Sequence, residues 1–167
     1  IITRKKGRNF DLFINYSFFL LSSIFFGFFA FRKKKFDYIF TFGTSPLTVA
    51  ITSLLLAKVC KSKTCLWVLD LWPDSLKAVG IVKSDKVLSI INRLVQFIYN
   101  RCDLILGQSK SFVSEITNNS SDVKVDYFPS WAEDVFDKKL ETKVVTLSYD
   151  NTFDILFAGN VGEAQDF

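Results

Sequence analysis

The chain contains no histidine and no methionine. Histidine is the commonest general base and the commonest metal ligand, so its absence excludes a catalytic site or a zinc centre built on imidazole. Methionine is missing even from position 1, where the residue is Ile1. Because a complete gene product normally begins with methionine, we expect the chain to be a piece of a longer protein.

Cysteine is also scarce, with Cys60, Cys65 and Cys102 as the only examples. Their number is odd, and their spacing matches no paired metal-ligand motif. All three stand beside apolar residues. They are therefore expected to be small buried hydrophobic residues of a protein in a reducing compartment, and no metal site is predicted.

Composition is typical of a folded domain. The chain has 167 residues, of which 49% are hydrophobic and 23% are charged, which is enough for one ordinary domain with a sizeable core and excludes a disordered protein. The net charge of +4 suits an anionic lipid surface or a phosphate-bearing ligand. It is too small to indicate nucleic acid, so no nucleic-acid partner is expected.

A long apolar run stands near the start. Residues 12–31 carry no charge and are followed by the basic cluster Arg32–Lys35. About 20 apolar residues are enough to cross a bilayer as a helix. Three interpretations remain open: a core helix that also touches the membrane, a true transmembrane span, and a fully buried helix of a large α/β domain.

After this run, strand-like and helix-like segments alternate. Such alternation is typical of an α/β protein with a doubly wound, Rossmann-like parallel sheet, in which ligands bind at the carboxyl ends of the strands. Ser45 and Ser109 are predicted helix N-caps, and Pro46 fits a first helical turn. The predicted strands lie within residues 36–43, 63–70, 102–109 and 123–131, and the predicted helices within residues 46–60, 85–100 and 109–117.

Composition also suggests a domain boundary. Residues 1–136 are expected to form a partial N-terminal domain, and the polar, irregular residues 137–152 a linker. Residues 153–167 return to an apolar strand followed by a glycine-containing loop. They are expected to be the first strand of a second, truncated domain.

The strand-to-helix junction after residue 69 carries the most chemistry. Asp70 follows an apolar strand, and Trp72, Asp74 and Ser75 come directly after it around Pro73. A sugar ligand suits this mixture, because hydroxyls need carboxylate acceptors and ring faces need an aromatic platform. The structural alternative is that Asp74 caps a helix and Trp72 fills a hydrophobic gap.

Four segments together resemble a known family. They are "FGTSPLTVA", "LWVLDLWPDSLKAVG", "IYNRCDLILGQSKSF" with "YFPSWAEDVF", and "LFAGNVGEAQDF". In this order they resemble a subgroup of bacterial glycosyltransferase family 4 that acts in O-antigen, colanic acid and capsule assembly and includes enzymes assigned as L-fucosamine transferases. The apolar run occupies the place of a hydrophobic helix in that subgroup.

The resemblance implies a GT-B fold, with an acceptor-side and a donor-side Rossmann-like domain. It implies a retaining transferase that needs no metal or other cofactor and moves a sugar from a nucleotide-sugar, expected to be UDP-linked, to a polyprenyl-diphosphate-linked acceptor. The implied location is the cytoplasmic face of the bacterial inner membrane, held peripherally or by a single span within residues 12–31. The fragment alone is expected to be inactive.

The resemblance also implies roles for individual residues. Asp70 is the expected catalytic residue, which orients the acceptor hydroxyl or accepts its proton. Many related transferases have a histidine near this loop, which this chain lacks. The acceptor-binding residues implied are Trp72, Asp74, Ser75, Ser109 and Lys110, and the donor-binding residues implied are Gly159, Asn160 and Gly162.

Three other interpretations stay open beside the transferase. The chain is alternatively a non-enzymatic α/β binding module anchored by its apolar helix. It is alternatively a cytosolic accessory domain attached to a true span, or an inactive remnant of a transferase gene. Binding of UDP-sugars and the strength of membrane attachment distinguish these interpretations.

Overall fold

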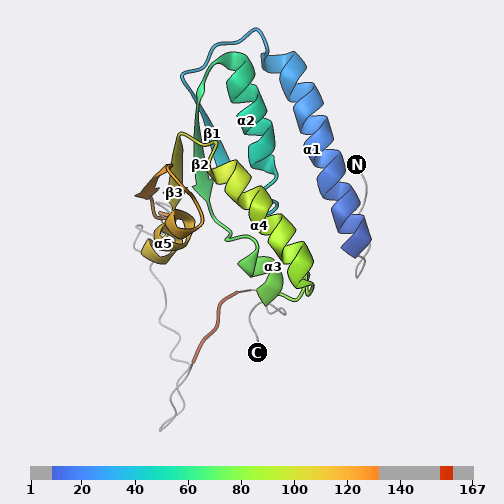
Figure 1. Ribbon diagram of the computed structural model, residues 1–167, viewed down its shortest axis with the longest axis vertical. Coiled ribbons are helices and arrows are strands. Elements are labelled where there is room, and N and C mark those ends of the chain that lie inside the picture. The colour runs from blue at the N-terminus through green and yellow to red at the C-terminus, as the bar shows by residue number, and fades with distance from the viewer. Residues whose placement is uncertain (1–8, 132–154, 160–167) are drawn as a thin grey trace, which may run out of the picture. The chain divides into compact units, whose positions relative to one another are not determined.

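A computed structural model describes residues 9–131 and 155–159 of the chain (Figure 1). The chain divides into two compact units, residues 1–129 and 130–167, which are described here separately. The first unit is an α/β fold in which strands alternate with helices, as predicted. Where the domain boundary lies, and where the predicted linker begins, stay predictions.

The sheet has four strands that are all parallel, in the order β1-β2-β3-β4, and its topology is Rossmann-like. Each of β2, β3 and β4 therefore pairs with the strand that precedes it in the chain. In chain order the elements are α1 (Asn9–Phe31), β1 (Tyr38–Gly43), α2 (Val49–Cys60), β2 (Lys63–Val68), α3 (Asp74–Ala78), α4 (Asp85–Tyr99), β3 (Leu104–Gly107), α5 (Lys110–Asn118) and β4 (Lys124–Tyr127).

Of the two predicted helix N-caps, Ser109 is confirmed and Ser45 is wrong. Ser109 caps α5 as predicted, because its hydroxyl accepts a hydrogen bond from the Phe112 backbone N–H at 3.2 Å. The prediction for α2 was wrong by three residues. This helix begins at Val49 after Thr48 rather than at Pro46, and Ser45 does not cap it. The Ser45 hydroxyl bonds elsewhere, as described below.

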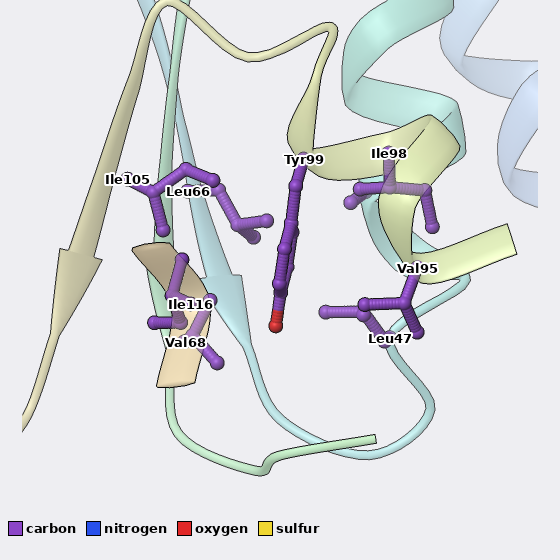
Figure 2. Packing of buried hydrophobic residues seen from close by; sticks show 9 residues of the cluster. Leu47, Leu66, Val68, Val95, Ile98, Tyr99, Ile105 and Ile116 are labelled. Carbon is purple, nitrogen blue, oxygen red and sulfur yellow. The ribbon is translucent and has the colours of Figure 1, made fainter. Parts of the chain in front are cut away.

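One face of the sheet carries the hydrophobic core (Figure 2). Leu66 and Val68 of β2 and Ile105 of β3 share this face because side chains alternate along a strand. Helices α2, α4 and α5 all pack on it. The buried residues that they supply are Ala50 from α2, Val95, Ile98 and Tyr99 from α4, and Ile116 from α5.

The other face of the sheet is rich in aromatic residues. The Trp67 ring is 4% exposed and lies 5.3 Å from the Phe42 ring and 5.2 Å from the Phe128 ring, measured between centroids. Its indole N–H donates to the Phe128 carbonyl at 3.0 Å. Phe40 and Phe42 on β1 are each 54% exposed. Within the described residues, this face is therefore only partly covered at β1.

Helix α1 packs beside α2 rather than on the sheet (Figure 1). Ser23 and Thr52 share a hydrogen bond of 2.8 Å, and the Cys60 thiol donates to the Phe31 carbonyl at 3.4 Å. Between these contacts Gly27 faces Leu56, and a Cβ there would lie 3.3 Å from the leucine side chain. These contacts recur every four residues on both helices, so α1 and α2 run in the same direction.

The second unit is described only at residues 130–131 and 155–159. Residues 155–159 form no strand, so the strand predicted there is not found in the described part of the segment. Ile155 and Leu156 are 86% and 85% exposed. A strand is stabilised by hydrogen bonds to a neighbouring strand, and no such pairing involves these described residues.

Buried thiols predict a loss of stability at high pH. Burial raises the pKa of the Cys102 thiol from 9.0 to about 12, and burial also raises the pKa of Cys65 and of Tyr99. These groups stay protonated in the folded chain while the unfolded chain ionises, so the free energy of unfolding falls as pH rises above about 9. Urea titrations at about pH 7.5 and about pH 10.5 measure this fall. Cys102→Ala should lessen it; an equal fall in both proteins would contradict the assignment.

Candidate functional site at the carboxyl edge of the sheet

The strand ends are held in register at one edge of the sheet. Gly43, Val68 and Gly107 are aligned across β1, β2 and β3. Beyond them, the Leu69 N–H donates to the Gly43 carbonyl at 3.1 Å, and the Gln108 side-chain amide donates to the Leu69 carbonyl at 3.3 Å. The loops that follow these three strands therefore emerge side by side.

Three polar side chains meet at this edge. The Ser45 hydroxyl donates a hydrogen bond to Oδ2 of Asp70. The Trp72 indole N–H lies 3.1 Å from the same carboxylate oxygen and 3.1 Å from the Ser45 hydroxyl oxygen, so it is shared between the two acceptors. We call Ser45, Asp70 and Trp72 the Asp70 corner. It joins the loop after β1 to the loop after β2.

The Asp70 corner leaves half of the carboxylate available. Both donors bind Oδ2, and no other described residue donates a hydrogen bond to Oδ1 of Asp70. Asp70 itself is half-buried at the edge of the sheet. A partly desolvated carboxylate with one free oxygen can accept a hydrogen bond from a ligand hydroxyl, or its proton.

Helix α3 begins directly after the Asp70 corner. Pro73 stands at its N-cap position, and Asp74 is exposed in its first turn. Ser75 is half-buried, and its hydroxyl oxygen is buried without a hydrogen-bond partner among the described residues. Asp74 is therefore available to a ligand, whereas the Ser75 hydroxyl faces the protein interior.

A cleft of about 480 Å³ opens beside the Asp70 corner, between α3, α4 and α5. The indole of Trp72 and the buried ring of Tyr99 form part of its wall. The polar residues that line it are Asp74, Ser89, Asn92, Glu115, Asn118 and Asn119. Trp72 therefore borders both this cleft and the Asp70 carboxylate.

The other predicted site residues have separate positions. Ser109 already serves as the cap of α5, and its hydroxyl also lies 2.8 Å from that of Ser111. Lys110 is exposed at the first residue of α5, and neither residue lines the cleft. Gly159 belongs to the second unit, where a Cβ would lie 2.9 Å from the Phe157 ring. Asn160 and Gly162 lie outside the described residues, so the donor-binding predictions stay predictions.

Sequence reasoning missed several residues of this site. Ser45 was interpreted as a helix cap, although its partner Asp70 lies 25 positions away in the chain. Asn92 and Asn119 were not singled out, and Tyr99 was not recognised as part of a cleft. One signal in the sequence could have pointed to this site. Asn92 and Gln96 are four positions apart in the predicted helix, so both amides lie on the same side of α4.

Within residues 9–131 and 155–159, no group of three or more cysteine, aspartate or glutamate side chains is arranged to hold a metal ion.

The chain matches no protein-family profile, and no curated protein or solved structure shows detectable similarity to it.

Proposed function

We propose that this chain is part of a glycosyltransferase of the bacterial family 4 subgroup that its motifs resemble. It would transfer a sugar from a nucleotide donor, expected to be UDP-linked, to a polyprenyl-diphosphate-linked acceptor in O-antigen or capsule assembly. The observation that carries the proposal is the Asp70 corner at the carboxyl edge of a parallel sheet. It offers a carboxylate oxygen beside an aromatic ring, the combination that a sugar hydroxyl and a sugar ring face require.

In this proposal each part of the site has one role. Asp70 is the catalytic residue, which orients the acceptor hydroxyl or accepts its proton through Oδ1. Trp72 and Asp74 contact the acceptor. Gly159, with Asn160 and Gly162, would approach the donor diphosphate through backbone amides. The reaction would retain the anomeric configuration without a metal.

The finer fold assignment is also a proposal. We expect the complete protein to contain a doubly wound sheet and the two-domain GT-B arrangement. The exposed rings of Phe40 and Phe42 support this, because purely parallel sheets are normally covered on both faces. A second layer on this face would bury these rings.

We place the protein at the cytoplasmic face of the bacterial inner membrane. Residues 13–31 of α1 have a mean hydropathy of 1.7, none of this segment is buried, and it is long enough to cross a bilayer. The exposed cluster Arg32–Lys35 directly follows, and each basic residue near an anionic surface contributes about 1 kcal/mol. A peripheral helix and a single span both fit these facts, and carbonate against detergent extraction distinguishes them.

The test is transfer of labelled sugar from UDP-sugars into the lipid extract of membranes that contain the complete gene product. Asp70→Asn preserves the shape of the corner but removes the charge, and should lower kcat by about 10²–10⁴-fold. Asp122→Asn, at an exposed position outside the site, is the matched control. Full turnover by Asp70→Asn would refute the assignment of Asp70.

The same assay separates the rival functions. Saturable UDP-sugar binding without any transfer would favour the non-enzymatic binding module. Absence of both would favour an inactive remnant. Turnover by residues 1–167 alone that equals turnover by the complete gene product would contradict the expectation that the fragment is inactive.

A further inference from the structure

We propose that the cleft between α3, α4 and α5 binds a neutral, hydroxyl-rich saccharide, the sugar portion of the acceptor. The role of this sugar as an acceptor rests on the proposed function, whereas its binding does not. The cleft has a volume of about 480 Å³, within the range of about 300–1,000 Å³ that small-molecule sites occupy. Trp72 lies in its wall, and the Trp72 indole N–H lies 3.1 Å from Asp70 Oδ2.

A chain of two hydrogen bonds between side-chain amides determines which amide groups of the cleft can donate to a ligand. Gln96 donates to Oδ1 of Asn119 at 2.9 Å, and Asn119 donates to Oδ1 of Asn92 at 2.8 Å. Both asparagine carbonyl oxygens are therefore occupied. The Asn92 amide nitrogen, which makes no hydrogen bond to any other described residue, is left to donate to a ligand oxygen.

Tyr99 provides a second, independent indication of a ligand. The residue is 1% exposed, and its buried hydroxyl has no hydrogen-bond partner among the described residues. Figure 2 shows the ring between the core residues Val68 and Val95, with its hydroxyl directed away from the α4 backbone. Buried polar groups without a partner are rare in folded proteins. A ligand hydroxyl in the adjoining cleft would supply the missing hydrogen bond.

The charges of the cleft select the class of ligand. Asp74 and Glu115 are exposed at its rim, and none of its described lining residues is a lysine or an arginine. Two carboxylates accept hydrogen bonds from sugar hydroxyls but repel phosphate and uronate groups. The cleft is therefore suited to the neutral sugar and not to the diphosphate of the acceptor.

The first experiment titrates the full chain, in detergent and without nucleotide-sugar, with methyl glycosides of glucose, N-acetylglucosamine, N-acetylgalactosamine and rhamnose. Calorimetry should detect saturable binding of at least one of them. The methyl glycoside of glucuronic acid differs from that of glucose by one carboxylate. It should bind at least about tenfold more weakly than the glucose compound, because Asp74 and Glu115 repel it. Absence of binding by every neutral glycoside would overturn the inference.

Two variants test whether the saccharide binds in the cleft. Tyr99→Phe removes only the hydroxyl that lacks a partner, so it should leave the thermal midpoint unchanged or higher and weaken saccharide binding by about tenfold. Asn92→Ala should weaken binding similarly. Their controls are Tyr38→Phe and Arg93→Ala, which change exposed residues outside the cleft.

Unchanged affinity in both cleft variants would overturn the inference even if the complete protein transfers sugar. Conversely, saccharide binding that depends on Tyr99 and Asn92, in a protein that transfers no sugar, would support the cleft and contradict only the proposed function. The two failures are therefore distinguishable.

Discussion

Replacing Phe18, Phe26 and Phe29 together with glutamate is expected to release the chain from phospholipid membranes. These rings are 59%, 68% and 57% exposed, and helical spacing puts them on one side of α1. The two hydrogen bonds and the glycine contact that join α1 to α2 are made by Ser23, Gly27 and Phe31, so the substitutions leave these contacts in place. A charged side chain inside a bilayer costs about 2.5–3.5 kcal/mol, so three should lower binding at least about a hundredfold.

Sedimentation with vesicles of phosphatidylethanolamine and phosphatidylglycerol measures this effect. The matched control replaces the same three residues with leucine, which keeps the surface apolar and should keep the chain on the vesicles. A sample without vesicles corrects for aggregation, and circular dichroism checks that the helices persist. Equal sedimentation of the glutamate and leucine variants with vesicles would show that α1 does not contact lipid.

Ile98→Ala should remove a large part of the stability of the first unit. Ile98 is 1% exposed and belongs to the core cluster between α4 and the sheet (Figure 2). Truncating a buried isoleucine to alanine costs about 2–5 kcal/mol, because apolar contacts are lost and a cavity remains. Since natural domains are stable by only about 5–15 kcal/mol, the variant should unfold at a much lower urea concentration.

The same helix offers a matched control for this prediction. Ile90 also lies on α4 but is 65% exposed. Ile90→Ala has the same effect on helix propensity and deletes the same atoms, yet should change the free energy of unfolding by no more than about 0.5 kcal/mol. Urea unfolding followed by circular dichroism gives both values. Equal midpoints for the two variants would contradict the described orientation of α4.

The sequence predicts the fold well where the signals are local. The run from Asp85 to Tyr99 repeats apolar residues at helical spacing and forms α4, and Ser109 caps α5 through its own first turn. The continuous apolar run Lys63–Val68 predicts a strand, and it forms β2, which is buried and lies between β1 and β3. For the two helices the physical cause lies within one or two turns of chain, so no distant partner must be known.

The predictions that missed involve partners that are far apart in the sequence. Ser45 has the residue type of a helix cap, but the carboxylate of Asp70 competes for its hydroxyl across two neighbouring strand ends. The local sequence does not show whether the Ser45 hydroxyl bonds to a backbone N–H of the following helix or to the carboxylate of Asp70. The chain of amide hydrogen bonds from Gln96 to Asn92 likewise exists only because α5 packs beside α4, which brings Asn119 between them.

The strand expected within residues 153–167 stays a prediction, because the structure describes only residues 155–159 of it. The composition of this segment resembles that of a strand, yet composition alone does not create the neighbour with which a strand must pair. The described residues there have no regular structure. A strand prediction from composition therefore depends on a neighbouring strand that the pattern itself does not supply.

The chain-order arrangement of the sheet bears on how the protein is made. Each described strand after β1 pairs with the strand synthesised before it, so it meets an edge that has already left the ribosome. The unit β1–α2–β2 is the first part of the described sheet to be synthesised, and each later strand follows a further helical crossover. Strands β1 and β2 therefore require no later strand in order to pair with each other.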